Sequence, residues 1–203
     1  ALLMIPLIWT VCWRGQQDGN AWTTWAAAFS TGIAAGMCGI VVGHEMGHKK
    51  PKSIGWWMGR ATLVSLMYAH FTTEHNHNHH KWVATERDPA SPTANQGLWS
   101  FWASTIPGQF SSSVRIHNRK GRTGLSNPSY QGLLLQTAAI VSLAIVPGHM
   151  RWFDGTPLVV GWLVASAIAI LTLEYVNYIR HWGLRRSVDD RLEARHSWNT
   201  EAR

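Results

Sequence analysis

Apolar stretches about as long as a bilayer is thick alternate along this chain with short polar connectors. Residues 21–43, 131–147 and 157–179 contain a single charged side chain between them, Glu174. A helix needs about 20 consecutive apolar residues to cross the hydrocarbon core of a membrane, so each stretch is predicted to span it. Residues 2–13 are also apolar, and we expect them to be part of a further span that the start of the chain cuts short. The pattern predicts an all-α, polytopic membrane helical bundle.

The apolar stretch at residues 54–70 is shorter, and Arg60 interrupts it. It follows a basic turn at residues 49–52, which the positive-inside rule places in the cytoplasm. If the stretch crossed the membrane, the histidines before and after it would lie on opposite sides, so we predict a re-entrant or interfacial segment. Residues 98–106 are predicted to form a short amphipathic helix at the interface. We expect one membrane domain over residues 1–203, truncated at both ends.

Charge and aromatic content narrow the choice of partner. The chain has a formal net charge of +7 and 13 tryptophans. Its basic residues are concentrated beside the apolar stretches, and seven of the 13 tryptophans fall within those stretches. This arrangement is typical of a membrane surface rather than of a nucleic-acid site. We therefore expect contact with membrane lipid and exclude nucleic acid as a partner.

Six of the eleven histidines lie in two short runs, and the first is His44-Glu45-Met46-Gly47-His48. Residues four apart share one face of a helix, so His44 and His48 can bind one metal ion while Glu45 points aside. The same H-E-x-x-H pattern also marks zinc proteases, in which the glutamate is the general base. At this point a zinc protease remains a serious alternative.

The second run, Glu74 to His80, supplies more imidazoles than a zinc protease needs. On an α-helix His75 and His79 share a face, and His80 lies about 100° round, where it can reach a neighbouring metal. His77 falls near the opposite face and is predicted not to bind. We expect Glu74 to bridge metals or to orient an imidazole ring.

A third group lies at the end of the last apolar stretch, where Glu174, Asn177 and His181 follow helical spacing. A carboxylate about two turns inside a membrane helix is costly and is by default functional. We therefore predict His181 as a further ligand, supported by Glu174 or Asn177. Taken alone, each remaining histidine is more typical of a hydrogen-bonded interfacial residue than of a ligand.

Several motifs together carry a resemblance to a known family. They are residues 44–49 (HEMGHK), Glu74-His75-Asn76 with His79-His80, Ala84-Thr85, residues 88–91 (DPAS), Asn177-Tyr178-Ile179 with His181, and Gly183-Leu184. In this order they resemble the integral-membrane alkane 1-monooxygenases of the AlkB type, within the fatty-acid-desaturase-like superfamily. The resemblance covers nearly the whole chain.

The resemblance implies a six-helix enzyme with a histidine-rich, non-haem di-iron site at the cytoplasmic face of the bacterial inner membrane. Such an enzyme uses two iron ions and O2 to convert alkanes to 1-alkanols, with electrons from rubredoxin and rubredoxin reductase. The apolar substrate would come from the bilayer, through a tunnel between residues 21–42 and 157–179. Carried over by position, the iron ligands would be His44, His48, His75, His79, His80 and His181.

Two features depart from the family pattern. The family has three more ligand histidines downstream of a segment resembling His196-Ser197-Trp198-Asn199, and this sequence stops before them. We therefore expect the fragment to be inactive alone. Arg180 stands where the family usually has a glutamate next to the lone ligand, which inverts a local charge.

Three alternatives stay open. The first is a related membrane di-iron hydroxylase or desaturase that acts on aromatic or acyl substrates. The second is an intramembrane zinc protease built on His44 to His48. The third is a metal transporter, which the sequence disfavours because only Glu174 lies deep within a predicted span.

Overall fold

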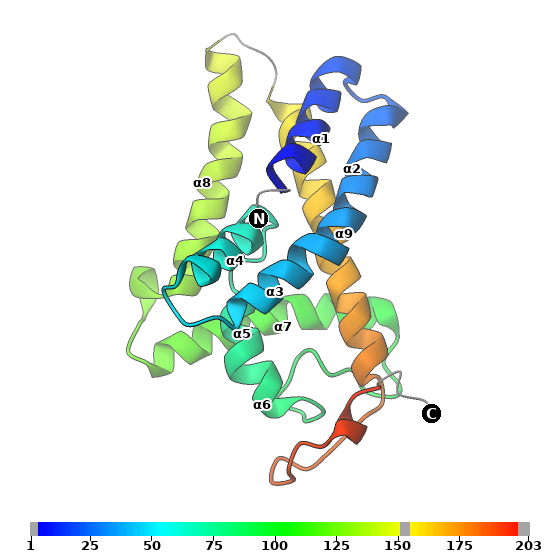
Figure 1. Cartoon of the computed structure of the whole chain (residues 1–203), viewed down its shortest axis with the longest axis vertical. Coiled ribbons are helices and arrows are strands. Elements are labelled where there is room, and N and C mark those ends of the chain that lie inside the picture. Colours follow the sequence, from blue (N-terminus) through cyan, green and yellow to red (C-terminus); the bar gives the residue numbers. More distant parts are fainter. Residues whose placement is uncertain (1–3, 151–154, 199–203) are drawn as a thin grey trace. The chain divides into compact units, whose positions relative to one another are not determined.

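The protein is seen in a computed structural model that describes residues 4–150 and 155–198. All regular elements in these ranges are helices, which confirms the predicted all-α fold (Figure 1). The chain folds as two compact units. Unit 1 comprises residues 1–69 and 131–172, and unit 2 comprises residues 70–130 and 173–203. Residues 2 and 3 of the first predicted span lie outside the described residues, as do 151–154 and 199–203 of the predicted domain.

Unit 1 begins with a helical hairpin. Its helices are α1 (Met4–Asp18) and α2 (Trp22–Ala34), which lie side by side (Figure 1). The polar turn between them is closed by Asp18, which accepts hydrogen bonds from Arg14 Nη1 at 3.0 Å and from Thr23 Oγ1 at 2.6 Å. Helix α1 therefore runs past the apolar residues 2–13 and ends on a polar cap.

The second helix of the hairpin continues without a break through a π-helical segment. This segment is η1 (Ala35–Ile40), and it leads into α3 (Val41–Gly47). Together the three elements form one helix, Trp22–Gly47, that is long and apolar enough to cross a membrane. Two other helices of the described chain meet the same criterion, Pro128–Val146 and Thr156–His181. They belong to α8 (Pro128–His149) and α9 (Thr156–His181).

Glycines bring α2 and η1 into close contact with α9 inside unit 1. A Cβ atom on Gly32 would lie 2.6 Å from Ile168 Cβ and 2.8 Å from the carbonyl oxygen of Ala165. One on Gly36 would lie 2.9 Å from Thr172 Cβ. Small residues at such positions let membrane helices approach closely, because packing takes the place of the hydrophobic drive. The two helices are in direct contact at Gly32 and Gly36, and the tunnel between residues 21–42 and 157–179 stays a prediction.

Helix α4 (Ile54–Ser65) corresponds to the short apolar stretch. Twelve residues reach about 18 Å at 1.5 Å per residue, whereas the bilayer core is about 30 Å thick. The carbonyl groups at its end are satisfied by other parts of unit 1, because Trp162 Nε1 donates to Ser65 O at 2.7 Å and Gln136 Nε2 donates to Val64 O at 3.1 Å. The re-entrant or interfacial placement of residues 54–70 stays a prediction.

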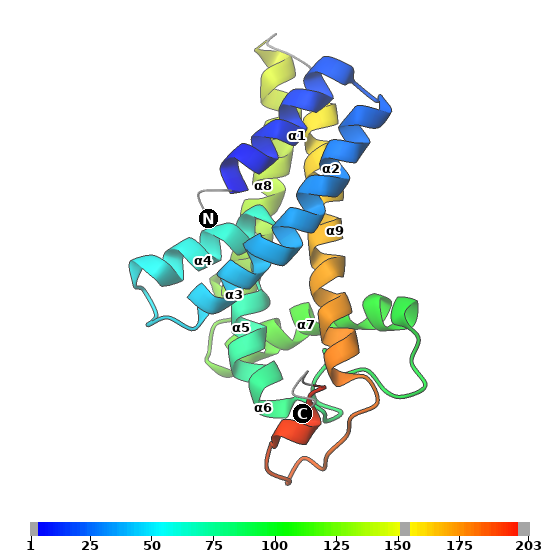
Figure 2. The same cartoon turned by 45° about the vertical axis from the view of Figure 1, so that its right-hand side comes forward.

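Unit 2 opens with three short elements that run on as one helix (Figure 2). They are α5 (Phe71–Glu74), the π-helix η2 (His75–His79) and α6 (His80–Trp82). After a loop comes α7 (Leu98–Arg119), which is longer than the predicted 98–106 and has Pro107 in its interior. The remaining elements are short 3₁₀ turns, η3 (Gly124–Ser126) and η4 (Ala194–His196), together with the end of α9.

Buried side chains explain why α7 continues past its proline. Phe101, Thr105, Gln109 and Ser112 recur every three or four residues and are all buried. A proline in a helix interior removes one backbone hydrogen bond and crowds the preceding turn. Packing of a continuous buried stripe outweighs that cost, since most helix stability in proteins comes from tertiary contacts.

Two arginines fasten the last segment of unit 2 to the loop after α6. Arg186 donates to Val83 O at 2.9 Å and to Lys81 O at 2.8 Å. Arg185 donates from both terminal nitrogens to Ser91 O at 3.0 Å. These bonds use the fixed fork of the guanidinium group to hold carbonyl groups that no helix satisfies.

Substitution of Gly32 by alanine is expected to destabilise the protein by about 1–3 kcal/mol, because the new methyl group overlaps Ile168 and the Ala165 carbonyl group. Thermal unfolding in detergent measures the effect. Gly55→Ala is the matched control, since its Cβ would meet only Lys49 Cγ at 3.4 Å. It should be neutral or stabilising by up to about 1 kcal/mol. Equal stability of the two variants would contradict the tight packing of α2 on α9.

Candidate metal centre

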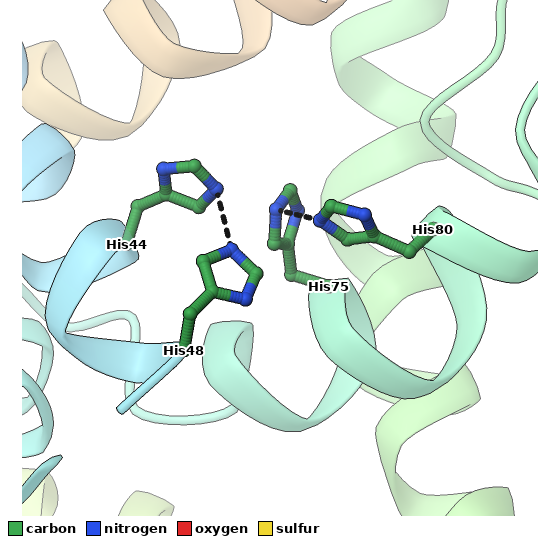
Figure 3. A group of neighbouring side chains, drawn as sticks. All are labelled: His44, His48, His75 and His80. Atoms are coloured by element: carbon green, nitrogen blue, oxygen red, sulfur yellow. Dashed lines mark hydrogen bonds between the residues drawn. The ribbon is translucent and has the colours of Figure 1, made fainter. Parts of the chain in front are cut away.

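Helix α3 presents the first histidine pair. His44 Nε2 and His48 Nε2 lie 3.0 Å apart, as their spacing of four residues predicts (Figure 3). His44 is half-buried and His48 is exposed. Glu45 is exposed and places Oε1 3.3 Å from His44 Nδ1, on the other side of that ring. The pair thus points two ring nitrogens at one place and leaves them available to a metal ion.

The second pair joins the start of η2 to the start of α6 and uses a different spacing. His75 Nε2 and His80 Nε2 are 2.8 Å apart (Figure 3). In a π-helix the hydrogen bonds run between residues five apart, so side chains five apart stand above one another. The sequence prediction assumed an α-helix and placed His80 about 100° away. The structure differs here because the run His75–His79 is π-helical.

His79 lies beside this pair and is oriented by a carboxylate. Its ring stacks on His75 with 5.1 Å between centroids, and its Nδ1 is 2.9 Å from Asp88 Oδ2. Asp88 is buried and also accepts from Ser91 Oγ at 2.6 Å and from the Ala90 amide at 3.1 Å. A histidine whose Nδ1 donates to a carboxylate keeps Nε2 free for a metal, which is the usual arrangement in metal sites.

Electrostatics strengthen the bond between His79 and Asp88. Burial opposes the charge on His79, but Asp88, with smaller contributions from Glu74 and Glu174, outweighs burial and raises the pKa of the imidazole above its ordinary value. Burial likewise opposes the charge on Asp88, yet His79 and the Ser91 hydroxyl lower the pKa of the carboxyl group. Asp88 therefore stays ionised and fixes the ring.

His181, at the end of α9, is the fourth histidine of this group in unit 2. Its ring centroid is 5.1 Å from that of His79, and the side chain is buried. His181 Nδ1 faces the carbonyl oxygen of His196 at 3.4 Å, a long contact. The ring of His196 makes a different hydrogen bond, in which its Nδ1 accepts from the Glu193 amide at 3.0 Å. The predicted ligands His75, His79, His80 and His181 thus gather in unit 2, while His44 and His48 gather in unit 1.

His77 takes no part in this group. It is exposed, and both partial burial and the charge of Lys120 lower the pKa of its imidazole. Such a ring stays neutral and solvated, and its predicted role as a bystander stays a prediction.

Three carboxylates are buried around these histidines. Glu74 is 1 % exposed, Asp88 3 % and Glu174 0 %, whereas no lysine or arginine is buried in the described part of unit 2. Burial, and next the charge of Asp88, raise the pKa of Glu74 to about 8. Its Oε1 accepts from Asn78 Nδ2 at 2.9 Å, and its Oε2 is buried without a hydrogen-bond partner.

This charge distribution fits a bound metal. Buried carboxylates without cationic partners are costly, and a metal cation held by neutral imidazoles supplies the missing positive charge. The donor set is all imidazole, with carboxylates in the surrounding layer. The residues present therefore suit a metal centre.

Glu174 and Asn177 form part of a polar cluster that extends to α7. Glu174 accepts from Asn177 Nδ2 at 3.1 Å, from Gln109 Nε2 at 2.9 Å and from Thr105 Oγ1 at 3.3 Å. The sequence reasoning did not single out Gln109, Thr105 or Asp88. Asp88 lies in the motif at residues 88–91, but the sequence assigns it no role. Gln109 and Thr105 belong to no motif that marks them as functional.

Comparison with known proteins supplies an independent finding. The family model "Fatty acid desaturase" matches residues 20–203. The chain is 33 % identical to an alkane 1-monooxygenase of Pseudomonas putida over 96 % of its own length and 49 % of that protein. It is 36 % identical to an alkane 1-monooxygenase 2 of Alcanivorax borkumensis over 84 % of its length and 46 % of that protein.

A relative with another printed substrate is also similar. The chain is 28 % identical to the xylene/toluene monooxygenase hydroxylase component of Pseudomonas putida, over 81 % of its length and 44 % of that protein. The chain thus spans about half the length of these curated relatives. The three apolar helices identify an integral membrane protein, and its clustered histidines can hold a metal ion.

Replacing Asp88 by alanine is expected to lower metal affinity by about 10–100-fold, because the His79 ring loses the acceptor that fixes its orientation. Competition with a chelator, followed by measurement of bound metal, gives the affinity. Asp189→Ala is the matched control, since Asp189 is exposed. Unchanged metal affinity in the Asp88 variant would show that His79 is not a ligand held by this carboxylate.

Proposed function

The chain belongs to the fatty acid desaturase family, and from this premise we propose that it is an O2-dependent membrane monooxygenase that converts alkanes to 1-alkanols. The observation that carries the proposal is the two histidine pairs, with Nε2 atoms 3.0 and 2.8 Å apart, in a chain similar to alkane 1-monooxygenases. Closely paired imidazole nitrogens are what a metal centre needs, and a hydrolytic site has no use for so many.

We propose two iron ions as the metal, held by His44, His48, His75, His79, His80 and His181. Imidazole suits iron, and iron is a redox metal, unlike zinc. A methyl C–H bond has no acidic proton and no polar handle, so general acid–base groups cannot break it. When bound, iron would supply the redox chemistry by which O2 takes up electrons and becomes an oxidant strong enough to break a methyl C–H bond.

The chain's own residues position the rings. Asp88 orients His79, and the His196 carbonyl group faces the Nδ1 of His181. Glu45 stands beside the Nδ1 of His44. Burial raises the pKa of Glu74 to about 8, so this carboxyl group is largely protonated near neutral pH until a cation binds. A bound metal would favour its ionised form, and Glu74 and Glu174 would then offset part of the metal charge.

The substrate and the electron donor follow from the surroundings of the site. An alkane dissolves in the bilayer, and apolar helices of unit 1 are exposed to that medium, with Phe29, Met37 and Leu163 all on their outer surface. The basic turn at residues 49–52 supports a cytoplasmic site in the bacterial inner membrane. An acidic rubredoxin, reduced by rubredoxin reductase, is the donor that the basic face marked by the turn at residues 49–52 would attract.

The similarity to the xylene/toluene enzyme supports one second candidate, hydroxylation of a methyl group on an aromatic ring. Both reactions insert oxygen into a methyl C–H bond. They differ in the shape of the apolar group that is bound.

The protein is expressed in membranes from its full natural reading frame and given an alkane, an electron donor and labelled O2. The expected product is a 1-alkanol that carries one labelled oxygen atom. His80→Ala should abolish product and lower bound iron, because His80 is half of a pair. His77→Ala is the matched control within the same run and should retain both. Labelled benzylic alcohol from an alkylbenzene, with no alkanol from linear alkanes, would favour the second candidate, and product that survives His80→Ala would sink the site.

Turnover with an acidic protein donor is expected to fall by about tenfold as salt screens its attraction to the basic face. Donor-dependent rates at increasing ionic strength measure this. A small uncharged reductant serves as the control and should be insensitive to salt. Equal salt dependence with both reductants would contradict steering by charge.

A further inference from the structure

Glu174 is an unusual carboxylate because it is fully buried and accepts hydrogen bonds from three neutral side chains of unit 2. It lies in a helix apolar enough to span a membrane and is 0 % exposed. Gln109 Nε2 donates to its Oε1 at 2.9 Å, while Thr105 Oγ1 and Asn177 Nδ2 donate to its Oε2 at 3.3 and 3.1 Å. Both oxygens are therefore fixed in place by named partners.

Both carboxylate oxygens of Glu174 lie within hydrogen-bond distance of side-chain donors. Gln109 Nε2 also donates to Thr105 Oγ1 at 3.0 Å, so the threonine hydroxyl has its own hydrogen left for Glu174. Every donor in the cluster then points at the carboxylate. Hydrogen bonds to the charged form of a carboxylate favour that form, and here they act against the desolvation that burial brings.

The cluster joins α7 to α9, the helix that ends at the predicted ligand His181. Glu174 precedes His181 by seven residues on α9, which is about 10 Å along the axis. At that spacing it is not a ligand beside His181, but its charge acts on the neighbouring histidines. In a low-dielectric interior a unit charge is felt over this distance.

We propose that Gln109 and Thr105 are positioning residues that hold Glu174 as a fixed negative charge for the metal centre, and that this charge lowers the centre's reduction potential. The inference deepens the proposed function and rests on it for the presence of a redox metal. A fixed anion stabilises the more positive, oxidised state, so α7 takes part in setting how readily the centre accepts electrons.

A merely structural role predicts something different. If the cluster only fastened α7 to α9, its removal would lower thermal stability and leave the potential of the bound metal unchanged. The reduction potential therefore separates the two roles.

The test uses the iron-loaded protein without substrate, titrated electrochemically and followed by Mössbauer or EPR spectroscopy. Glu174→Gln keeps the shape and removes the charge, and it should raise the potential. Gln109→Leu should shift the potential the same way by a smaller amount, because a buried carboxylate that loses a donor tends to take up a proton. Thr105→Val should do likewise, whereas Thr105→Ser keeps the hydroxyl and should match the original protein.

Gln136→Leu is the matched control, because Gln136 is also a buried glutamine but donates to the backbone carbonyl of Val64. It should leave the potential unchanged. A potential that stays constant in Glu174→Gln with iron retained would overturn the proposal, as would equal shifts in Gln109→Leu and Gln136→Leu. Should Glu174→Gln fail to retain iron, an unshifted potential in Thr105→Val would overturn it.

Failure of this inference can be distinguished from failure of the proposed function. Absence of iron or of any redox signal in the unaltered protein would sink the di-iron assignment itself. A wrong alkane substrate would leave the potentials, and so this inference, untouched.

Discussion

A buried negative charge needs a buried positive partner or a full set of hydrogen-bond donors, and this requirement governs unit 2. Asp88 meets it with His79, Ser91 and a backbone amide. Glu174 meets it with neutral donors from two helices. Glu74 meets it only in part, and its raised pKa records the shortfall. The negative charge of these buried carboxylates is accordingly left for a bound cation to balance, near the histidines that could hold it.

Both histidine pairs are associated with π-helical segments. Segment η1 lies just before the helix that carries His44 and His48, and η2 contains His75 and leads into His80. A π-helical turn adds a residue and so rotates the side chains that follow relative to the preceding face. The same helix can thus present small glycines to a neighbouring helix in one turn and ligands to a metal in a later one.

The sequence predicted the parts of this protein that depend on local pattern. The three long apolar helices follow from hydropathy, and the His44–His48 contact follows from a spacing of four. The His75–His80 contact was missed because nothing in that run distinguishes π-helical from α-helical phase. Gln109 was missed because its partner Glu174 is 65 residues away along the chain. Contacts of that kind depend on tertiary packing, which a single sequence does not reveal.

The arginine fork at Arg186 has a consequence for biosynthesis. It bonds Val83 and Lys81 across sequence separations of 103 and 105 residues. At about 5–20 residues per second, roughly 5–20 seconds of translation separate the histidine run from the segment that fastens its loop. During that interval the histidine run has been synthesised, but Arg186, which binds the Val83 and Lys81 carbonyl groups, has not. Closure of the loop, and hence a settled ligand set, is a late event in the life of the nascent chain.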